Sequence, residues 1–407
     1  MKIILILIFK SLVILTSLTS CNEQKKSGFG AKPKSRLVYT EVESIPLGDS
    51  ILSAPYDKEY FLFFKEVEYI PLKQNPSFAP IGVTSKVLLY DNNIIALDVF
   101  VGKNVNVFKN NGDFLYTIDE RNNIISPKDI VVKNKILYIL DSYCYVFSFD
   151  LSTGKYLKKY ELPFFSISLV AHDINSEDYI FDIYSISNKE NKGFDYWLLN
   201  YDLSKRKVLY ADFTKKEKEA SPVNFFNINK LSTKSSASIL SKPFNDTLFL
   251  INHKDIVPLV KFNFQKRSLS EQELFELGRN QRVGLEKIKK RDLFIGYRFP
   301  LVAGNILSVG YQIGRKRNLI YYDLDKKKLI VMTKFIDKKF YGAFDPRPIG
   351  VFENKMIYAI DVRAMRNYIN FLMKENKSFK VSQEAENIIK LSNGSNNPVI
   401  VLAKPSI

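Results

Sequence analysis

Four acidic or amide side chains stand at the ends of predicted apolar strands. These strands read "NNIIALD", "NKILYILD", "NDTLFLIN" and "NKMIYAID", and they end at Asp98, Asp141, Asn252 and Asp361. Side-chain oxygens of this kind can hold a cation or the hydroxyl groups of a sugar. Alternatively, an Asp or Asn that leaves a strand accepts hydrogen bonds from backbone N–H groups of the next turn. A structural requirement recurs in every repeat while a binding site seldom does, so the repetition favours the turn role.

A second group of candidates is basic. His253, Arg363 and Arg366 follow two of these strand ends, so we expect them on the same face as the four residues above. Guanidinium groups there could pair with a carboxylate, phosphate or sulfate, and so could Arg298 and Arg315 farther along the chain. The alternative for each is a solvated surface position. A mixed ring of acids and bases would suit a polar ligand such as a glycan or peptide.

Catalytic motifs are missing from the sequence. The chain has two histidines, His172 and His253, and no G-x-S-x-G, H-E-x-x-H, phosphate-loop or EF-hand pattern. We therefore assign no catalytic residue, metal ligand or cofactor, and leave a structural or channel cation open. The favoured function is a binding or scaffold module for a polar ligand or a partner protein. The alternative is a hydrolase or lyase with a metal or carboxylates at the mouth of a central channel.

The N-terminus has the layout of an export signal. Residues 1–20 are mostly apolar with two basic charges, Lys2 and Lys10, and they end in small residues before Cys21. The stretch "LTSC" fits the lipobox of bacterial lipoproteins, which predicts a signal peptide over 1–20 and a lipid on the Cys21 thiol. An uncleaved membrane span or a buried strand is the alternative, and Lys10 argues against a span. We expect a polar tether over 21–58 and, since no acidic cluster follows Cys21, an outer-membrane anchor that faces the periplasm.

Composition limits the partners. Removing Lys2 and Lys10 with the signal lowers the formal charge of the 407-residue chain from +17 to +15, and apolar residues make up 46%, enough for a packed core. The positive charge is scattered through turns and mixed with acids, so we predict no nucleic-acid binding. We expect a monomer held at the membrane by its lipid. Once Cys21 is modified, Cys144 has no disulfide partner and is predicted to be a buried thiol.

A repeat of about 40 residues organises the rest of the chain. Asp98 and Asp141 are 43 residues apart, and Phe108 and Phe149 are 41 apart. Each apolar strand precedes a hairpin, and five hairpins are visible: "VNVFKNNGDFLYTI", "YVFSFDLSTGKYLKKY", "LLNYDLSKRKVLY", "LVKFNFQKRSLS" and "LIYYDLDKKKLIVM". A four-stranded unit of this length is typical of a β-propeller blade, which must stack on its neighbours to bury its faces.

The sequence therefore predicts an all-β, six-bladed β-propeller over 59–407. The sixth blade would combine "NKMIYAIDV", "NPVIVLAK" and the early strand "FKEVEYIPLK", which closes the ring and removes free sheet edges. Small helical insertions are expected in the last two blades, one beginning with the capping box of Ser270 and Glu273 and two lying between Arg363 and Gly394. A pair of β-sandwiches is the alternative fold.

These strands and turns resemble those of the six-bladed β-propeller lipoproteins of Bacteroidota, which are similar in architecture to NHL-repeat propellers. The resemblance covers about residues 60–405 and lies in the order of five motifs: "VEYIPLK", "GDFLYTI", "LYILD", "KPFNDTLFLI" and "NNPVIVLAKP". Members of this family often carry a "GNGPGE"-like loop after the first hairpin, where this chain reads "DERNNIISPKDI", so no role of that loop transfers. The family is largely of unknown function, and the resemblance implies a fold and a location, not a reaction.

Overall fold

The computed structural model describes most of the chain after the predicted signal and tether. The residues described are 35–38, 40–48, 64–171, 178–183, 196–214, 227–230, 237–242, 244–252, 255–270, 273, 281–332 and 339–407. Cys21, His172 and His253 lie outside these ranges, so the roles predicted for Cys21 and His253 stay predictions.

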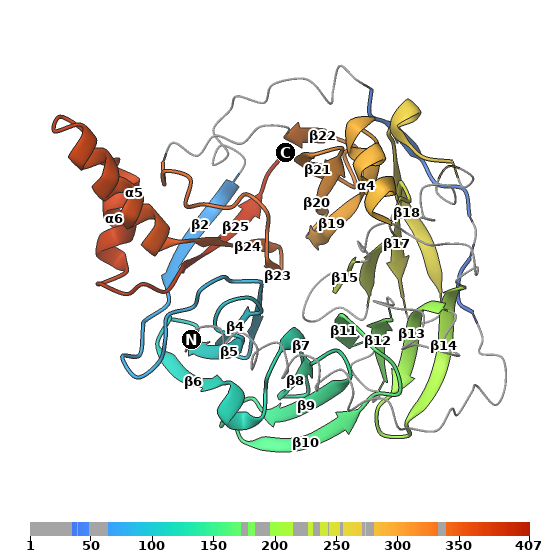
Figure 1. Ribbon diagram of the computed structural model, residues 1–407, viewed down its shortest axis with the longest axis horizontal. Helices are drawn as coiled ribbons and strands as arrows, with labels where there is room; N and C mark the ends of the chain where they lie inside the picture. Colours follow the sequence, from blue (N-terminus) through green and yellow to red (C-terminus); the bar gives the residue numbers. More distant parts are fainter. Residues whose placement is uncertain are drawn as a thin grey trace, which may run out of the picture.

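Within this part of the chain, six β-sheets surround a central axis and form a six-bladed β-propeller (Figure 1). The first sheet has β3 (Lys86–Tyr90), β4 (Asn93–Asp98), β5 (Asn104–Lys109) and β6 (Phe114–Ile118). The second has β7 (Pro127–Lys133), β8 (Ile136–Asp141), β9 (Tyr145–Asp150) and β10 (Tyr156–Glu161). The third has β11 (Ser168–Ala171), β12 (Asp178–Asp182), β13 (Tyr196–Asp202) and β14 (Lys207–Thr214).

The remaining three sheets complete the ring. The fourth has β15 (Asn227–Lys230), β16 (Ser238–Ser241), β17 (Thr247–Ile251), β18 (Ile256–Asn263) and β1 (Ser44–Pro46). The fifth has β19 (Phe294–Ala303), β20 (Ile306–Ile313), β21 (Lys316–Asp323) and β22 (Leu329–Met332). The sixth has β23 (Gly350–Phe352), β24 (Lys355–Ile360), β25 (Val399–Pro405) and β2 (Phe64–Pro71).

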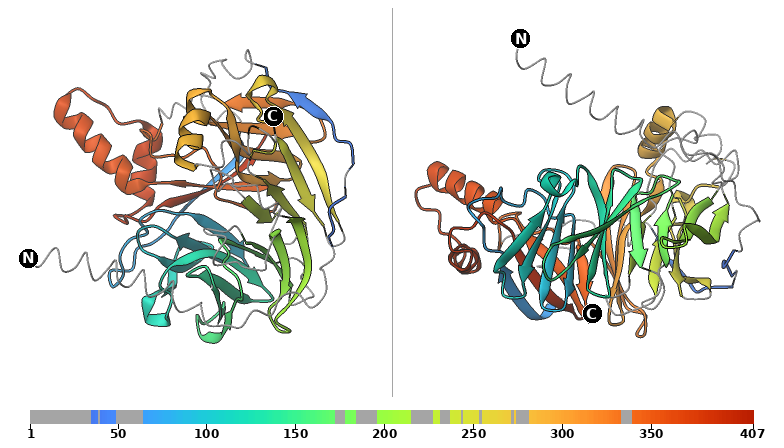
Figure 2. Two further views of the ribbon diagram at one scale, coloured as in Figure 1. Left: turned by 45° about the vertical axis from the view of Figure 1, so that its right-hand side comes forward. Right: turned by 90° about the horizontal axis from the view of Figure 1, so that it is seen from below.

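Packing between neighbouring sheets explains the continuous apolar strands of the repeat. In β4 and β8, five of six residues are buried, because each sheet has another sheet against both of its faces. One core cluster joins Ile95 and Val107 of the first sheet to Ile139 and Phe149 of the second. The innermost strands, such as β3, β7 and β11, contact one another around the axis (Figures 1 and 2). They surround the central channel of the propeller.

The ring closes as the sequence predicts. Strand β2, from the start of the propeller, pairs with β25, and Tyr69 lies opposite Val401. Strand β25 also pairs with β24, so it lies inside the sixth sheet with a partner on each side. Strands that are more than three hundred residues apart in the sequence are thereby held in one sheet, which closes the ring.

The fourth sheet departs from the prediction. The segment "LVKFNFQKRSLS" does not form a hairpin, because the chain passes from β18 into the short 3-10 helix η3 (Gln265–Arg267). The ring of Phe264 stacks on Phe294 of the fifth sheet at 4.1 Å between centroids, which draws the chain away from β18. Strand β1 takes the edge position instead and runs parallel to β18.

This pairing also moves the boundary of the domain. The predicted tether over 21–58 includes β1, yet Leu47 is buried in the core between the fourth and fifth sheets. Arg36, earlier in the same segment, forms a buried ion pair with Asp212 of β14. Residues 35–38 and 40–48 are therefore part of the propeller, since they bury apolar and charged groups that a solvated tether would leave in water.

Helices lie where the sequence places the insertions. Helix α4 (Gln281–Lys290) precedes the fifth sheet, while α5 (Val362–Glu375) and α6 (Gln383–Leu391) lie between β24 and β25 and project from the ring (Figure 2). Before α4, Ser270 and Glu273 form the predicted capping box, with Glu273 N–H donating to Ser270 Oγ at 3.2 Å and Ser270 N–H to Glu273 Oε2 at 3.0 Å. None of the helices in the described ranges has the length and apolar character that a membrane crossing requires.

Candidate functional site: the mouth of the central channel

A cavity of about 730 Å³ occupies the central channel. Five innermost strands contribute to its lining: β3, β7, β11, β19 and β23. Its apolar walls include Leu88, Leu97, Ile130, Leu301 and Ile349. Charged side chains gather near the end of the channel where β3 and β7 begin, which we call the mouth. A cavity of this size, apolar with a few convergent polar groups, is the usual form of a small-molecule site.

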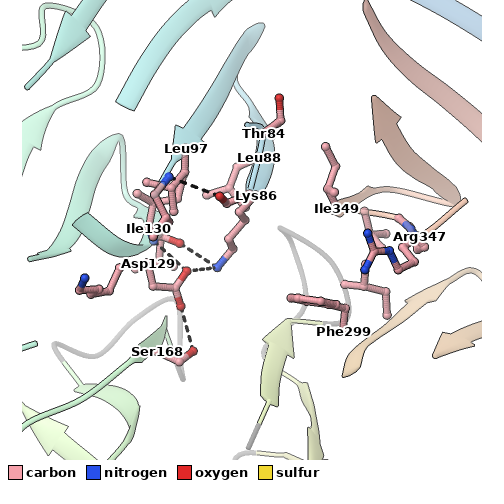
Figure 3. A pocket seen from close by; sticks show the side chains of 18 of the residues that line it. Thr84, Lys86, Leu88, Leu97, Asp129, Ile130, Ser168, Phe299, Arg347 and Ile349 are labelled. Atoms are coloured by element: carbon pink, nitrogen blue, oxygen red, sulfur yellow. Dashed lines mark hydrogen bonds and ion pairs between the residues drawn. The ribbon is translucent and has the colours of Figure 1, made fainter. Parts of the chain in front are cut away.

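One wall of the mouth is held by a hydrogen-bonded staple across three sheets (Figure 3). Lys86 Nζ of β3 donates to Asp129 Oδ1 of β7 at 2.6 Å and to the Ile130 carbonyl at 3.0 Å. Asp129 Oδ2 accepts from Ser168 Oγ at 2.8 Å and from the Leu169 N–H of β11 at 2.9 Å. Because Asp129 pairs with Lys86 of β3 and also accepts hydrogen bonds from β11, the Lys86–Asp129 pair is neutral and fixed in place.

The wall formed by the fifth and sixth sheets is rich in arginine. Arg298 of β19, Arg317 of β21 and Arg347 before β23 all line the cavity. Burial, together with the neighbouring guanidinium groups of Arg317 and Arg347, lowers the pKa of Arg298 to about 10. Arg347 pairs with Asp345, and this bond raises the pKa of Arg347. Figure 3 shows Arg347 and Phe299 across the cavity from Lys86 and Asp129.

A distortion of β19 places its side chains at the mouth. The register of β19 against β20 shifts between Arg298 and Leu301, and the intervening Phe299 has a φ of 49°. This left-handed conformation is unfavourable for a bulky residue, and such strain concentrates at functional sites. The Phe299 side chain is 45% exposed and lines the cavity. At this bulge both Arg298 and Phe299 line the channel.

The strand-end residues of the repeat serve their own turns. Asp98 is 0% exposed. Its carboxylate accepts five backbone N–H bonds, from Gly82, Val83, Phe100, Val101 and Gly102. Asp141 accepts from the N–H groups of Ile125 and Ser126 and from the hydroxyl of Ser142, while its burial raises its pKa.

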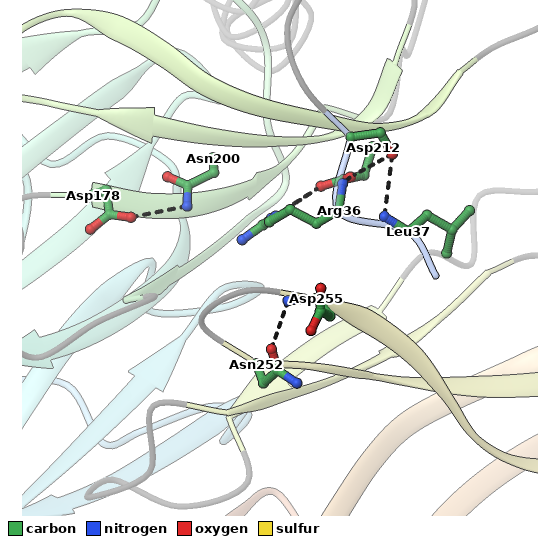
Figure 4. Close-up of polar contacts among 8 residues, drawn as sticks. Arg36, Leu37, Asp178, Asn200, Asp212, Asn252 and Asp255 are labelled. Carbon is green, nitrogen blue, oxygen red and sulfur yellow. Dashed lines mark hydrogen bonds and ion pairs between the residues drawn. The ribbon is translucent and has the colours of Figure 1, made fainter. Parts of the chain in front are cut away.

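The other two strand-end residues also bond to backbone. Asn252 Oδ1 accepts from the Asp255 N–H at 2.7 Å (Figure 4), and Asp361 caps α5 by accepting from the Ala364 N–H at 2.9 Å. Asp98, Asp141, Asn252 and Asp361 are absent from the lining of the cavity. These contacts agree with the turn role that the repeated sequence pattern favours. A role of these four residues in ligand binding stays a prediction.

The basic candidates separate into two places. Arg366 of α5 donates to the carbonyls of Gly394 and Ser395 and to Ser392 Oγ, so it fixes α5 to the connection after α6. Arg363 is exposed on α5, and Arg315 pairs with Glu286 of α4. None of these three residues lines the cavity, whereas Arg298 does. Of the arginines named from the sequence, the structure brings Arg298 alone to the mouth.

Six charged residues of the mouth escape sequence reasoning: Lys86, Lys128, Asp129, Arg317, Asp345 and Arg347. They stand near the starts of strands, whereas the visible repeat marks the strand ends. The sequence does contain a signal for them: a charged residue stands at the start of the first strand of a unit, as in "SKVLLY" and "PKDIVV". It is weak because the same pattern fits a solvated turn.

Cys144 is the cysteine that lies within the propeller. It is fully buried between β8 and β9, as expected, but it is disulfide-bonded instead of free. Its partner lies outside the described residues. The prediction of a free thiol applies to a chain lipidated at Cys21, so for that form it stays a prediction.

The fold and the cavity together define a six-bladed β-propeller with a ligand-sized channel mouth. The chain belongs to the family described as "Domain of unknown function (DUF4934)", whose model matches residues 44–404. The predicted six-bladed fold and the resemblance to a propeller family of unknown function are thus confirmed.

Two solved structures are similar to this chain. A Bacteroides fragilis protein whose name assigns it to export is similar at 16% identity and a TM-score of 0.68, over 89% of this chain and 99% of that chain. The β-propeller domain of Myceliophteria thermophila Cps50 (Swd1) is similar at 9% identity and a TM-score of 0.39, over 69% of this chain and 96% of that one. A search of curated proteins gives no match. At 16% identity the first likeness bears on the fold alone, and the second, at a TM-score of 0.39, supports no conclusion about this chain.

Proposed function

We propose that the protein is a binding module anchored to the cell envelope, and that its ligand is a small molecule seated in the channel mouth. The observation that carries this proposal is the cavity of about 730 Å³, whose apolar walls end in a few fixed polar groups. A binding role also suits the staple, because Lys86 and Asp129 are engaged with each other and with backbone. Neither side chain is poised to attack a substrate or to move a proton.

Filling the cavity should abolish binding. Thr84 lies on the cavity wall (Figure 3), and in Thr84→Trp an indole would occupy the space of a ligand without changing the charge. The probe is N-phenyl-1-naphthylamine, an uncharged dye whose emission rises in apolar surroundings. We expect the full-length protein to enhance this emission saturably and Thr84→Trp to lose most of the enhancement, as measured by fluorescence titration.

Lys155→Trp is the matched control. Lys155 is exposed in the turn between β9 and β10, at the end of the second sheet away from the mouth, so its indole should leave the titration unchanged. Equal dye binding by Thr84→Trp and the unchanged protein would contradict a ligand in the channel mouth. So would an absence of saturable binding.

The anchor is proposed to be a lipid on Cys21. The basis is the run "LVILTSLTSC", in which an apolar segment ends in small residues and then cysteine. We expect Cys21→Ala to move the protein from the membrane to the soluble fraction of fractionated cells, because one lost thiol removes the acyl chains. Equal membrane retention of the variant would refute the anchor.

Intact mass provides a second test of the anchor. The chain has two cysteines, so a disulfide between Cys21 and Cys144 and a lipid on Cys21 exclude each other. We expect the mass of the mature protein to include acyl chains. A mass without them, lower than that of the reduced chain by two hydrogens, would favour the disulfide. The proposed location is the outer membrane facing the periplasm, and removal of the protein by protease added to intact cells would contradict it.

A further inference from the structure

We propose that the ligand of the channel mouth is a small organic anion, with a carboxylate, sulfonate or phosphate head held by Arg298, Arg317 and Arg347 and an apolar body directed into the channel. The inference rests on the proposed function, because it names the chemistry of the same site. Two kinds of observation carry it: the balance of charge at the mouth and the way in which its arginines are held.

The charges at the mouth do not cancel. Three guanidinium groups stand on the wall of the fifth and sixth sheets, and Asp345 is the one carboxylate among the lining residues of that wall. On the opposite wall, Lys86 and Asp129 neutralise each other, and Lys128 adds a further positive charge. The described lining therefore carries an excess of positive charge, which an anion would balance within partly apolar surroundings.

The arginine at the centre of this wall is held in a defined orientation. Arg298 Nη2 donates to Gln312 Oε1 at 3.0 Å, and Gln312 Nε2 donates in turn to the Gly314 carbonyl at 2.9 Å. Gln312 also lies opposite Arg317 in the pairing of β20 with β21, so its strand position neighbours both arginines. A planar guanidinium held in this way can offer two parallel N–H groups to a carboxylate or phosphate.

The bulge at Phe299 supplies the other half of the site. Its ring is exposed at the mouth next to Arg298, although the left-handed backbone is costly for such a residue. An anion with an aromatic or aliphatic body could place its charge on the arginines and its body against Phe299 and the apolar wall. A free inorganic anion would use the arginines alone, so we expect it to bind more weakly.

Two dyes with the same aromatic body test the charge. 1-Anilinonaphthalene-8-sulfonate carries a sulfonate that the uncharged N-phenyl-1-naphthylamine lacks. We expect the unchanged protein to bind the sulfonate dye about tenfold more tightly than the uncharged dye. A tenfold difference in affinity is about what one charge-assisted hydrogen bond contributes. The ratio of the two affinities should approach one in Arg317→Gln. Arg317 is exposed, so this change removes charge without loss of packing. The half-buried Arg298→Gln provides a second variant.

Arg363→Gln is the control, because Arg363 is exposed on α5 and outside the cavity, and it should leave the affinity ratio unchanged. The proposal of an anionic ligand is wrong if the uncharged dye binds at the mouth and the sulfonate binds no more tightly. It is also wrong if the sulfonate still binds more tightly in both arginine variants. In either case the proposed binding function stands. If Thr84→Trp affects neither dye, the site itself is wrong. Inorganic phosphate should displace the sulfonate only at much higher concentration, and displacement at equal concentration would overturn the role of the apolar body.

Discussion

Replacing Arg36 with alanine should lower the free energy of unfolding by about 3–5 kcal/mol, the cost of leaving a buried charge without its partner. Asp212 of β14 is 0% exposed, and its carboxylate accepts from Arg36 Nε at 3.3 Å and from Arg36 Nη2 at 3.1 Å (Figure 4). The Arg36 N–H and Ser35 Oγ also donate to Asp212 Oδ1. The backbone and hydroxyl bonds would survive the substitution, but the compensating positive charge would not.

Urea unfolding of the full chain measures this effect. Lys73→Ala is the matched control, because Lys73 pairs with Asp113 in an exposed ion pair, and such a pair contributes about 0–1 kcal/mol. The double variant Arg36→Leu with Asp212→Asn should recover most of the loss, since it removes both charges and keeps an oxygen that can accept from the Arg36 N–H and Ser35 Oγ. A loss below about 1 kcal/mol in Arg36→Ala would show that Asp212 regains water when residues 35–48 detach, and that this segment contributes little to the fold.

The sequence predicts the propeller well because its signal is local and repeated. Strands such as β4 and β8 are apolar on both faces and end in an Asp, and the hairpin that follows fixes the next two strands. The sequence shows five such units and one early strand that has no hairpin partner. If that strand, β2, joins the last sheet, the ring closes and no sheet edge is left free. The structure has that pairing between β2 and β25.

Strand β1 could not be predicted in the same way. It is three residues long, "SIP", and it pairs in parallel with β18, from which it is separated by about two hundred residues. No local period or turn marks such a pairing. Phe264 packs on the fifth sheet, so the chain after β18 does not turn back to form a hairpin with it. The edge of β18 is therefore left open, and β1 covers it.

The candidate site is less accessible to sequence reasoning for a related reason. The conspicuous Asp98 and Asp141 recur because each turn needs a carboxylate to accept its backbone N–H groups. The mouth instead combines single residues from different blades, such as Asp129, Arg298 and Arg347, at positions that do not repeat. Only the closed ring brings them together.

Deleting residues 398–407 should prevent cooperative folding of the whole domain. The deletion removes β25, which lies between β24 and β2 and would leave an open edge on each. Five consecutive residues of this strand are buried: Val399, Ile400, Val401, Leu402 and Ala403. Burial of a Val, Leu or Ile side chain contributes about 1.5–3 kcal/mol, so the loss is comparable to the whole stability of a typical domain, about 5–15 kcal/mol.

Thermal unfolding followed by circular dichroism tests the deletion. Removal of 406–407 alone is the control, because these residues follow β25 and leave all its pairings intact, so a single cooperative transition should persist. If the ring depends on closure, the longer deletion should lose that transition altogether, even though the other five sheets keep every strand. A longer deletion that unfolds at the temperature of the full chain would mean that each blade is stable by its own packing. That result would conflict with the core clusters, because they join neighbouring sheets and leave no blade with a core of its own.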